Sequence, residues 1–161
     1  MDFEKRLERA IERGQRHSDL EARQDEERKM EDEAELKQLH TTYQLQLSEH
    51  IEKCLSKLAD HFPGFRFNTA TDERGWGAKI SRDDLHVQDG RRANAFSRLE
   101  MVISPYSSVH ILELRAKGTI RNKEVFKRTR YQKLSEADPH SFQELIDLWV
   151  LEYAELYAAK A

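Results

Sequence analysis

The sequence predicts an α+β fold in two layers, with a long N-terminal helix, an antiparallel β-meander of about five strands and a C-terminal helix packed on the sheet. Three observations lead to this fold. Apolar residues recur every three or four positions over residues 36–62, alternate over 65–132, and return to helical spacing after Pro139. The 161 residues are enough for one domain plus an arm.

The first segment, residues 1–35, is dominated by charge, with 21 of its 35 positions charged. Acidic residues precede basic ones by four positions, as Glu12 precedes Arg16, and this spacing stabilises a helix. An apolar stripe of Phe3, Leu7 and Ile11 fades after residue 15, so a continuous coiled-coil seam is missing. We therefore expect residues 1–35 to form a charged helical or partly disordered arm that a partner orders.

The next helix opens a single α+β domain, which we place at residues 36–161. Its apolar residues share one face over about seven turns. They are Leu36, Leu39, Tyr43, Leu47, Ile51, Leu55, Leu58 and Phe62. Pro63 and Gly64 end the helix. This apolar face must be buried on a sheet or on a second copy of the helix.

Alternation of apolar and polar residues then indicates an antiparallel sheet with one covered face. The expected strands are 65–71, 76–82, 95–104, 108–118 and 123–132. Hairpin connections are expected at 75–77, 89–90, 104–108 and 121–122, because these segments are rich in turn-forming residues. Residues 83–94 are predicted to form a loop or a short extra strand.

The last helix has a clear start, because Asp138 can cap it and Pro139 suits its first position. Its main apolar stripe includes Phe142, Ile146 and Trp149. Leu148 and Leu151 widen the apolar surface beyond one face. The helix is therefore expected to pack on the sheet on one side and on a second helix or subunit on the other.

Composition limits the compartment and the class of protein. Cys54 is the sole cysteine, so no intramolecular disulfide forms and nothing indicates an oxidising compartment. The N-terminus lacks the apolar stretch of a secretory signal. The longest apolar run has four residues, 148–151, far short of a membrane span. We expect a cytoplasmic protein with no membrane partner.

Side chains capable of chemistry are scattered. His50 and Cys54 share a helix face and could supply two metal ligands, but two ligands do not make a site. Cys54 lies in or beside the apolar stripe and is interpreted as a buried structural thiol. No nucleophile elbow or phosphate-binding loop is present in the sequence. We therefore predict no catalytic residue, cofactor or metal, and a protein that is not an enzyme.

Charge is divided into three blocks. The net charge is −5 over residues 1–60, +7 over 61–134 and −5 over 135–161. The basic block is densest in its last part, whose cationic residues are Arg115, Lys117, Arg121, Lys123, Lys127, Arg128, Arg130 and Lys133. These residues either neutralise acidic helices and guard a sheet edge, or bind a polyanion such as nucleic acid.

The first functional hypothesis is a protein-interaction module, an adaptor or scaffold, that forms a homodimer or binds a protein partner through helix-in-groove or coiled-coil contacts. The candidate interface residues are Leu36, Leu39, Tyr43, Leu47, Leu148 and Leu151. The alternative is nucleic-acid binding through the basic region 115–133. A further alternative is a small-ligand pocket between helix and sheet.

Overall fold

The computed structural model describes residues 2–160, apart from the side chains of residues 86, 88 and 93. The chain divides into two compact units, residues 1–38 and 39–161. Helix α1 (Phe3–His61) contributes residues to both units. Within residues 2–160, neither helix has an apolar stretch long enough to cross a bilayer.

The first unit is helical, and nearly all of its residues are exposed. Phe3, Leu7 and Ile11 form the short apolar stripe and stay open to solvent. The expected pairing of acid and base four positions apart is present where Arg16 Nη2 lies 3.6 Å from Glu12 Oε2. Both side chains are largely exposed, so this ion pair contributes little to stability.

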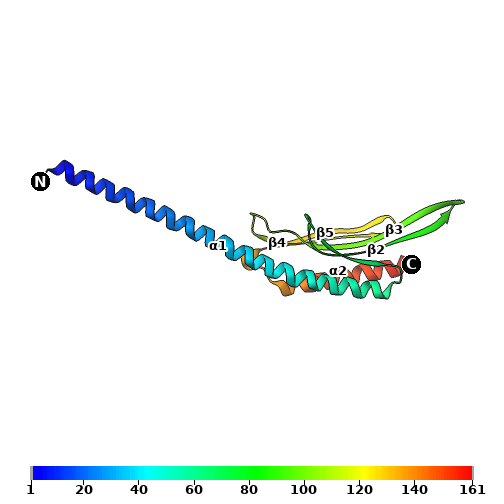
Figure 1. The fold of residues 1–161 in the computed structure, drawn as a ribbon. Helices are drawn as coiled ribbons and strands as arrows, with labels where there is room; N and C mark the ends of the chain where they lie inside the picture. Colours follow the sequence, from blue (N-terminus) through cyan, green and yellow to red (C-terminus); the bar gives the residue numbers. More distant parts are fainter. Residues whose placement is uncertain (1, 161) are drawn as a thin grey trace. The chain divides into compact units, whose positions relative to one another are not determined.

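The second unit is built on one antiparallel sheet in sequential order, β1-β2-β3-β4-β5. Its strands are β1 (Arg66–Asp72), β2 (Gly75–Gln88), β3 (Arg91–Ile103), β4 (Ile111–Ile120) and β5 (Lys123–Lys133). A short 3-10 turn, η1 (Leu134–Glu136), leads to helix α2 (Pro139–Lys160). The order of helix, five-stranded meander and helix confirms the predicted fold class (Figure 1).

Two hairpin turns lie where the sequence placed them. Asp89 and Gly90 join β2 to β3, and Arg121 and Asn122 join β4 to β5, all four with positive φ. Consecutive residues in this conformation give the turn that best matches the twist of two paired strands. Asn122 also reaches across the sheet, because its Oδ1 accepts a hydrogen bond from the Phe96 backbone N–H at 2.9 Å.

Three boundaries differ from the prediction. Residues 83–94 are neither a loop nor an extra strand, because β2 and β3 continue as one hairpin with Gln88 paired to Arg91. The β1–β2 turn lies at residues 73–74, and residues 75–77 already belong to β2. Strand β4 begins at Ile111 rather than at residue 108. Residues 83–94 were not predicted to continue the two strands because polar residues at the ends of β2 and β3 interrupt the apolar alternation.

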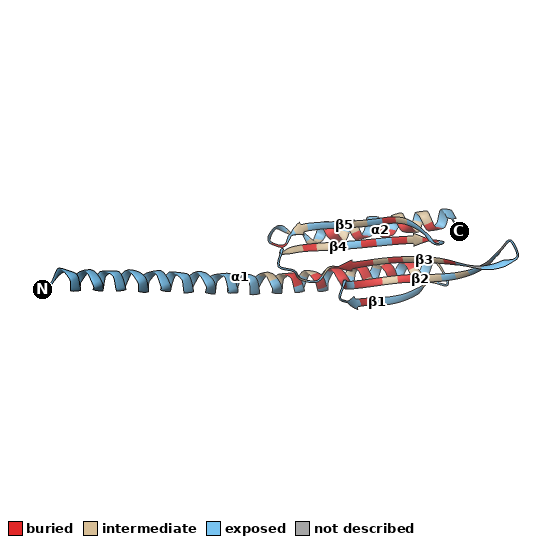
Figure 2. Cartoon of the chain, turned by 90° about the horizontal axis from the view of Figure 1, so that it is seen from above, coloured by how far each residue is buried: buried red, intermediate tan, exposed pale blue. Residues whose placement is uncertain are grey.

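The core lies between the sheet and a layer made of α2 and residues 39–61 of α1. Both helical segments cover the same face of the sheet (Figures 1 and 2). Fully buried aliphatic side chains come from both layers and include Leu47, Ile51, Leu55, Ile80, Leu99, Ile103, Leu112, Leu114 and Ile146. Leu47 therefore belongs to the core, which corrects its assignment to a partner interface.

Helix α2 begins and is anchored as the sequence indicated. Asp138 Oδ1 accepts a hydrogen bond from the His140 backbone N–H at 3.0 Å, which caps the helix at Pro139. Further along, the Tyr153 hydroxyl donates to the Thr119 carbonyl at 2.9 Å. The Tyr153 ring lies against Gly118, where an added Cβ would come within 3.1 Å of the ring. This glycine lets α2 approach β4 closely.

Candidate functional site

The seam between α1 and α2 forms an open surface groove of about 630 Å³, which we call the helix groove. Its lining is mostly apolar, with Leu58 of α1 and Phe62 just after that helix on one side and Val150, Leu151 and Ala154 of α2 on the other. Leu151 is 64% exposed, and the neighbouring Leu148 is 61% exposed. Apolar side chains on adjoining turns of α2 are therefore left in contact with water.

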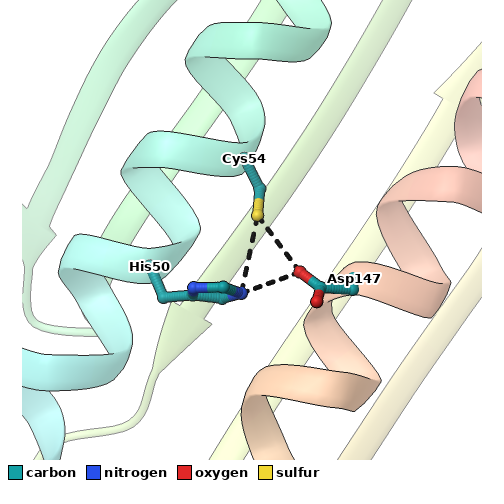
Figure 3. A group of neighbouring side chains, drawn as sticks. All are labelled: His50, Cys54 and Asp147. Carbon is teal, nitrogen blue, oxygen red and sulfur yellow. Dashed lines mark hydrogen bonds and ion pairs between the residues drawn. The ribbon is translucent and has the colours of Figure 1, made fainter.

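Three polar side chains converge at one end of the helix groove (Figure 3). His50 Nε2 lies 2.7 Å from Asp147 Oδ1 and 3.6 Å from Cys54 Sγ. The Cys54 thiol donates to Asp147 Oδ1 at 3.4 Å. His50 and Cys54 are one turn apart on α1, whereas Asp147 comes from α2, so the cluster joins the two helices.

The cluster is arranged differently from a nucleophilic relay. In a relay, the base takes the proton of the nucleophile with one ring nitrogen and is oriented through the other. Here Cys54 and Asp147 both face Nε2 of His50. Burial and the neighbouring Asp147 carboxylate raise the pKa of the Cys54 thiol to about 11, which keeps the thiol protonated at neutral pH. Neither feature supports an activated thiolate.

Cys54 is only partly buried, because it borders the helix groove. The expectation of a thiol buried in the core is therefore not met. The two-ligand arrangement considered from the sequence also gains a third group, Asp147. A sequence signal for Asp147 exists, since it lies at helical spacing from Val150, Leu151 and Ala154. Its position opposite His50 depends on how α1 and α2 pack, which no local pattern contains.

The basic residues of 115–133 divide between the two faces of the sheet. Arg115 and Lys117 of β4 and Lys127 of β5 line a shallow depression on the face opposite the helices, which we call the open face. Lys117 stands directly opposite Lys127. Arg121 lies in the β4–β5 turn, and Lys123 and Lys133 are the end residues of β5.

Arg128 and Arg130 lie on the helix side, in register with the buried Ala116 and Leu114. The Arg128 guanidinium forms a two-point ion pair with Glu152 of α2, including an Nη2–Oε1 contact of 2.8 Å. Arg130 borders a second surface groove, between β5 and α2, together with Leu148. The eight basic residues therefore do not form one surface, and Arg128 joins the sheet to a helix.

The six residues proposed for a partner interface are also separated. Leu148 and Leu151 are exposed on α2, as an interface requires. Leu39 and Tyr43 are half-buried in the second unit, and Leu36 is half-buried in the first. The exposed pair on α2 is therefore the part of the predicted set that remains available to a partner.

No protein-family model, curated protein or solved structure matches this chain. Its function must therefore be argued from its own surfaces.

Proposed function

We propose that the protein is an interaction module that forms a homodimer through the helix groove and the exposed face of α2. The supporting observation is exposed apolar surface on α2, where Leu151 lines the helix groove and Leu148, three residues earlier in the helix, is equally exposed. Contiguous exposed apolar surface on a folded domain marks contact sites more often than isolated apolar residues do. Burying the exposed parts of Leu148 and Leu151 stabilises a complex in proportion to the apolar area removed from water.

The charges beside the groove favour a second copy as the occupant. Lys57 of α1 stands on one rim, and Asp147 and Glu155 of α2 stand on the other. A two-fold axis that places α1 of one protomer on α2 of its partner brings the lysine of one copy to the carboxylates of the other. Such a surface is self-complementary, as a symmetric dimer interface requires.

The size of the surface is also suitable. Helix α2 has 22 residues, which corresponds to a length of about 33 Å. Two helices side by side, each roughly 10 Å wide, give a face on the order of 700 Å². A stable complex buries about 800 Å² on each partner. The helix layer of the second unit is therefore close to the area that a dimer needs.

The test is sedimentation of the full chain over a concentration series. The variant Leu148→Glu/Leu151→Glu places two carboxylates in the proposed interface and should shift the protein to monomer, with its helical circular dichroism unchanged. The matched control is Leu85→Glu, because Leu85 is 75% exposed on the β2–β3 hairpin. This variant should associate like the wild type.

Two results would count against the proposal. One is a monomeric wild-type chain across the concentration series. The other is a dimer that survives Leu148→Glu/Leu151→Glu but dissociates with Leu7→Glu/Ile11→Glu, since Leu7 and Ile11 form the exposed stripe of the first unit. That second result would assign association to the arm.

A second candidate function is polyanion binding on the open face, favoured by the like charges of Lys117 and Lys127. Like charges directly opposite each other on paired strands destabilise a sheet. The nearest acidic neighbour in register with Lys117 is Glu100. Glu100 already forms ion pairs with Arg98 and with Arg74. An external anion would relieve the remaining repulsion.

Fluorescence anisotropy with single- and double-stranded nucleic acid at two salt concentrations tests this candidate. Binding should weaken steeply with salt. Lys117→Ala/Lys127→Ala should weaken it further and lower the salt slope by about 2, because each lysine is expected to neutralise one phosphate. The control is Lys5→Ala/Lys29→Ala, which removes the same charge from two exposed lysines of the first unit. Equal losses of binding in both variants would mean that binding depends on the net charge of the protein and not on the open face.

A further inference from the structure

His50, Cys54 and Asp147 offer one nitrogen, one sulfur and one oxygen to a common point, and these donor atoms all lie within 4.8 Å of one another. Figure 3 shows the three side chains pointing toward each other across the α1–α2 seam. His50 and Cys54 are four residues apart, which places both on one face of α1. Asp147 faces them from α2.

The separations are close to those of a tetrahedral metal centre. Zn²⁺ bonds to nitrogen and oxygen at about 2.0–2.1 Å and to sulfur at about 2.3 Å, so neighbouring donors in a tetrahedron lie about 3.4–3.6 Å apart. The Cys54 sulfur is 3.6 Å from His50 Nε2 and 3.4 Å from Asp147 Oδ1. The remaining separation, 2.7 Å between Nε2 and Oδ1, is shorter. A small rotation of the Asp147 side chain, which is 52% exposed, would lengthen it.

The donor types select the ion. A thiolate and an imidazole favour a borderline-soft transition ion over Mg²⁺ or Ca²⁺, which take oxygen ligands. Three protein donors are the set found where zinc keeps its fourth position for water or a further ligand. We propose that His50 Nε2, Cys54 Sγ and the Asp147 carboxylate bind one Zn²⁺ per chain and thereby link α1 to α2. Binding releases the thiol proton to solvent, because only the thiolate is a ligand.

All three donors belong to one chain, so the site does not require the proposed dimer, although Asp147 also lines the helix groove. Zinc should therefore bind at one ion per chain in the Leu148→Glu/Leu151→Glu variant as well. The ion would sit at one end of the helix groove, since Cys54 and Asp147 also line that groove. Its direct effect is to hold the two helices together, whatever later packs on them.

Titration of the full-length, reduced protein with Co²⁺ tests the ligand set, because Co²⁺ takes the same donors and, unlike Zn²⁺, absorbs visible light. Saturation at one ion per chain should bring the strong d–d bands of a tetrahedral centre and a near-ultraviolet thiolate charge-transfer band. Added Zn²⁺ should displace Co²⁺ and abolish both. Cys54→Ser should remove the charge-transfer band and weaken Zn²⁺ binding at least about 100-fold, beyond the loss typical of residues that only support a ligand.

Asp147→Asn supplies a second ligand variant that leaves the buried core untouched, because Asp147 is exposed. It should weaken Zn²⁺ binding while the circular dichroism stays that of the wild type. The control is His140→Gln, since the exposed His140 pairs with Glu144 on the first turns of α2. This control should bind Zn²⁺ like the wild type.

Thermal melting provides a readout that does not depend on colour. Zn²⁺ should raise the melting temperature of the wild type and of His140→Gln, and leave that of Cys54→Ser and Asp147→Asn unchanged. Binding of equal strength in all four proteins would mean adventitious surface binding and would overturn the proposal. Absence of saturable binding at one ion per chain in the wild type would overturn it as well.

Discussion

The ion pair between Arg128 and Glu152 should stabilise the second unit measurably, although Arg128 belongs to the stretch predicted to bind a polyanion. The guanidinium makes two contacts with the Glu152 carboxylate and lies over the Phe126 ring, 4.8 Å from its centroid. The Trp149 ring centroid is 5.9 Å away. Arg128→Ala removes all of these contacts together, and with them the packing of the arginine stem.

The magnitude follows from exposure. The Arg128 and Glu152 side chains are 36% and 40% exposed, so solvent screening limits the pair to about 0.5–1 kcal/mol. The cation–π contact adds about 0.5–1 kcal/mol at a site of this exposure. We therefore expect Arg128→Ala to lower the free energy of unfolding by about 1–2 kcal/mol, and the melting temperature by about 2–4 °C for each kcal/mol.

Urea unfolding of Arg128→Ala, Glu152→Gln and the double variant isolates the ion pair as a coupling free energy. The hydrogen bonds that Glu152 accepts from Arg128 lower the pKa of the Glu152 carboxyl below its ordinary value of 4.5. Because the pKa of Glu152 is lower in the folded chain, the ion pair stabilises the fold fully above about pH 4.5. This stabilisation is lost as the pH falls through the folded-state pKa. The coupling should therefore be about 0.5–1 kcal/mol at pH 7 and disappear in acid.

Coupling below about 0.2 kcal/mol at pH 7 would show that the bridge does not form in solution, and would refute the reasoning. A second refuting result is an Arg128→Ala variant that keeps full stability but no longer binds nucleic acid. That outcome would mean that Arg128 contacts nucleic acid and does not stabilise the fold. The conservative Arg128→Lys variant should lie between wild type and alanine, because lysine keeps the charge without the two-point geometry.

Three further predictions concern the packing of the second unit. Tyr153→Phe removes the hydroxyl that donates to the Thr119 carbonyl, and should lower the free energy of urea unfolding by about 1 kcal/mol. Ile51→Ala truncates a fully buried residue of α1, and should cost about 2–5 kcal/mol in the same assay. His40 is buried, which lowers its pKa below 6.5, and its Nε2–H donates to the Ser104 carbonyl at 3.1 Å. Protonation therefore favours the unfolded chain, so stability should fall as the pH drops below 6.5, and His40→Gln should flatten this loss when unfolding is compared at pH 5 and 7.5.

The helices, the approximate number of strands and two turns could be predicted from the sequence because their signals are local. Apolar spacing over 36–62 identifies a helix wherever that helix packs, and Asp89–Gly90 forms a hairpin turn through its own backbone preferences. The ends of the strands were harder to predict from the sequence. Asp83 and Asp84 interrupt the apolar pattern, yet both pair with residues of β3, because hydrogen bonding extends the hairpin beyond its apolar part.

The face on which Arg128 lies could also have been inferred. Phe126, Arg128 and Arg130 alternate along one strand and share a face. Since Phe126 is apolar and buried, the same face carries Arg128 toward the helices. The same alternation places Lys127 on the opposite face, so charge density along the sequence does not by itself define one surface.

The cluster of His50, Cys54 and Asp147 could not be predicted from the sequence. It depends on how α1 and α2 align, and these two helices are separated in sequence by all five strands. Helix periodicity gives the face of each residue but not which turn of α1 meets which turn of α2. Shifting α2 by one turn would move Asp147 by about 5.4 Å. That displacement exceeds every separation within the cluster.

The sheet separates two surfaces of opposite character. Among residues 2–160, Arg128 is the basic residue of 115–133 that forms an ion pair with a helix. Direct ion pairs with the helices therefore account for little of the positive charge of 115–133. Arg115, Lys117 and Lys127 instead face away from the helices. The helix layer carries the apolar groove and the three metal-ligand candidates. Substitutions on one face should leave the other unchanged, so polyanion binding can be decided separately from dimerisation and zinc binding.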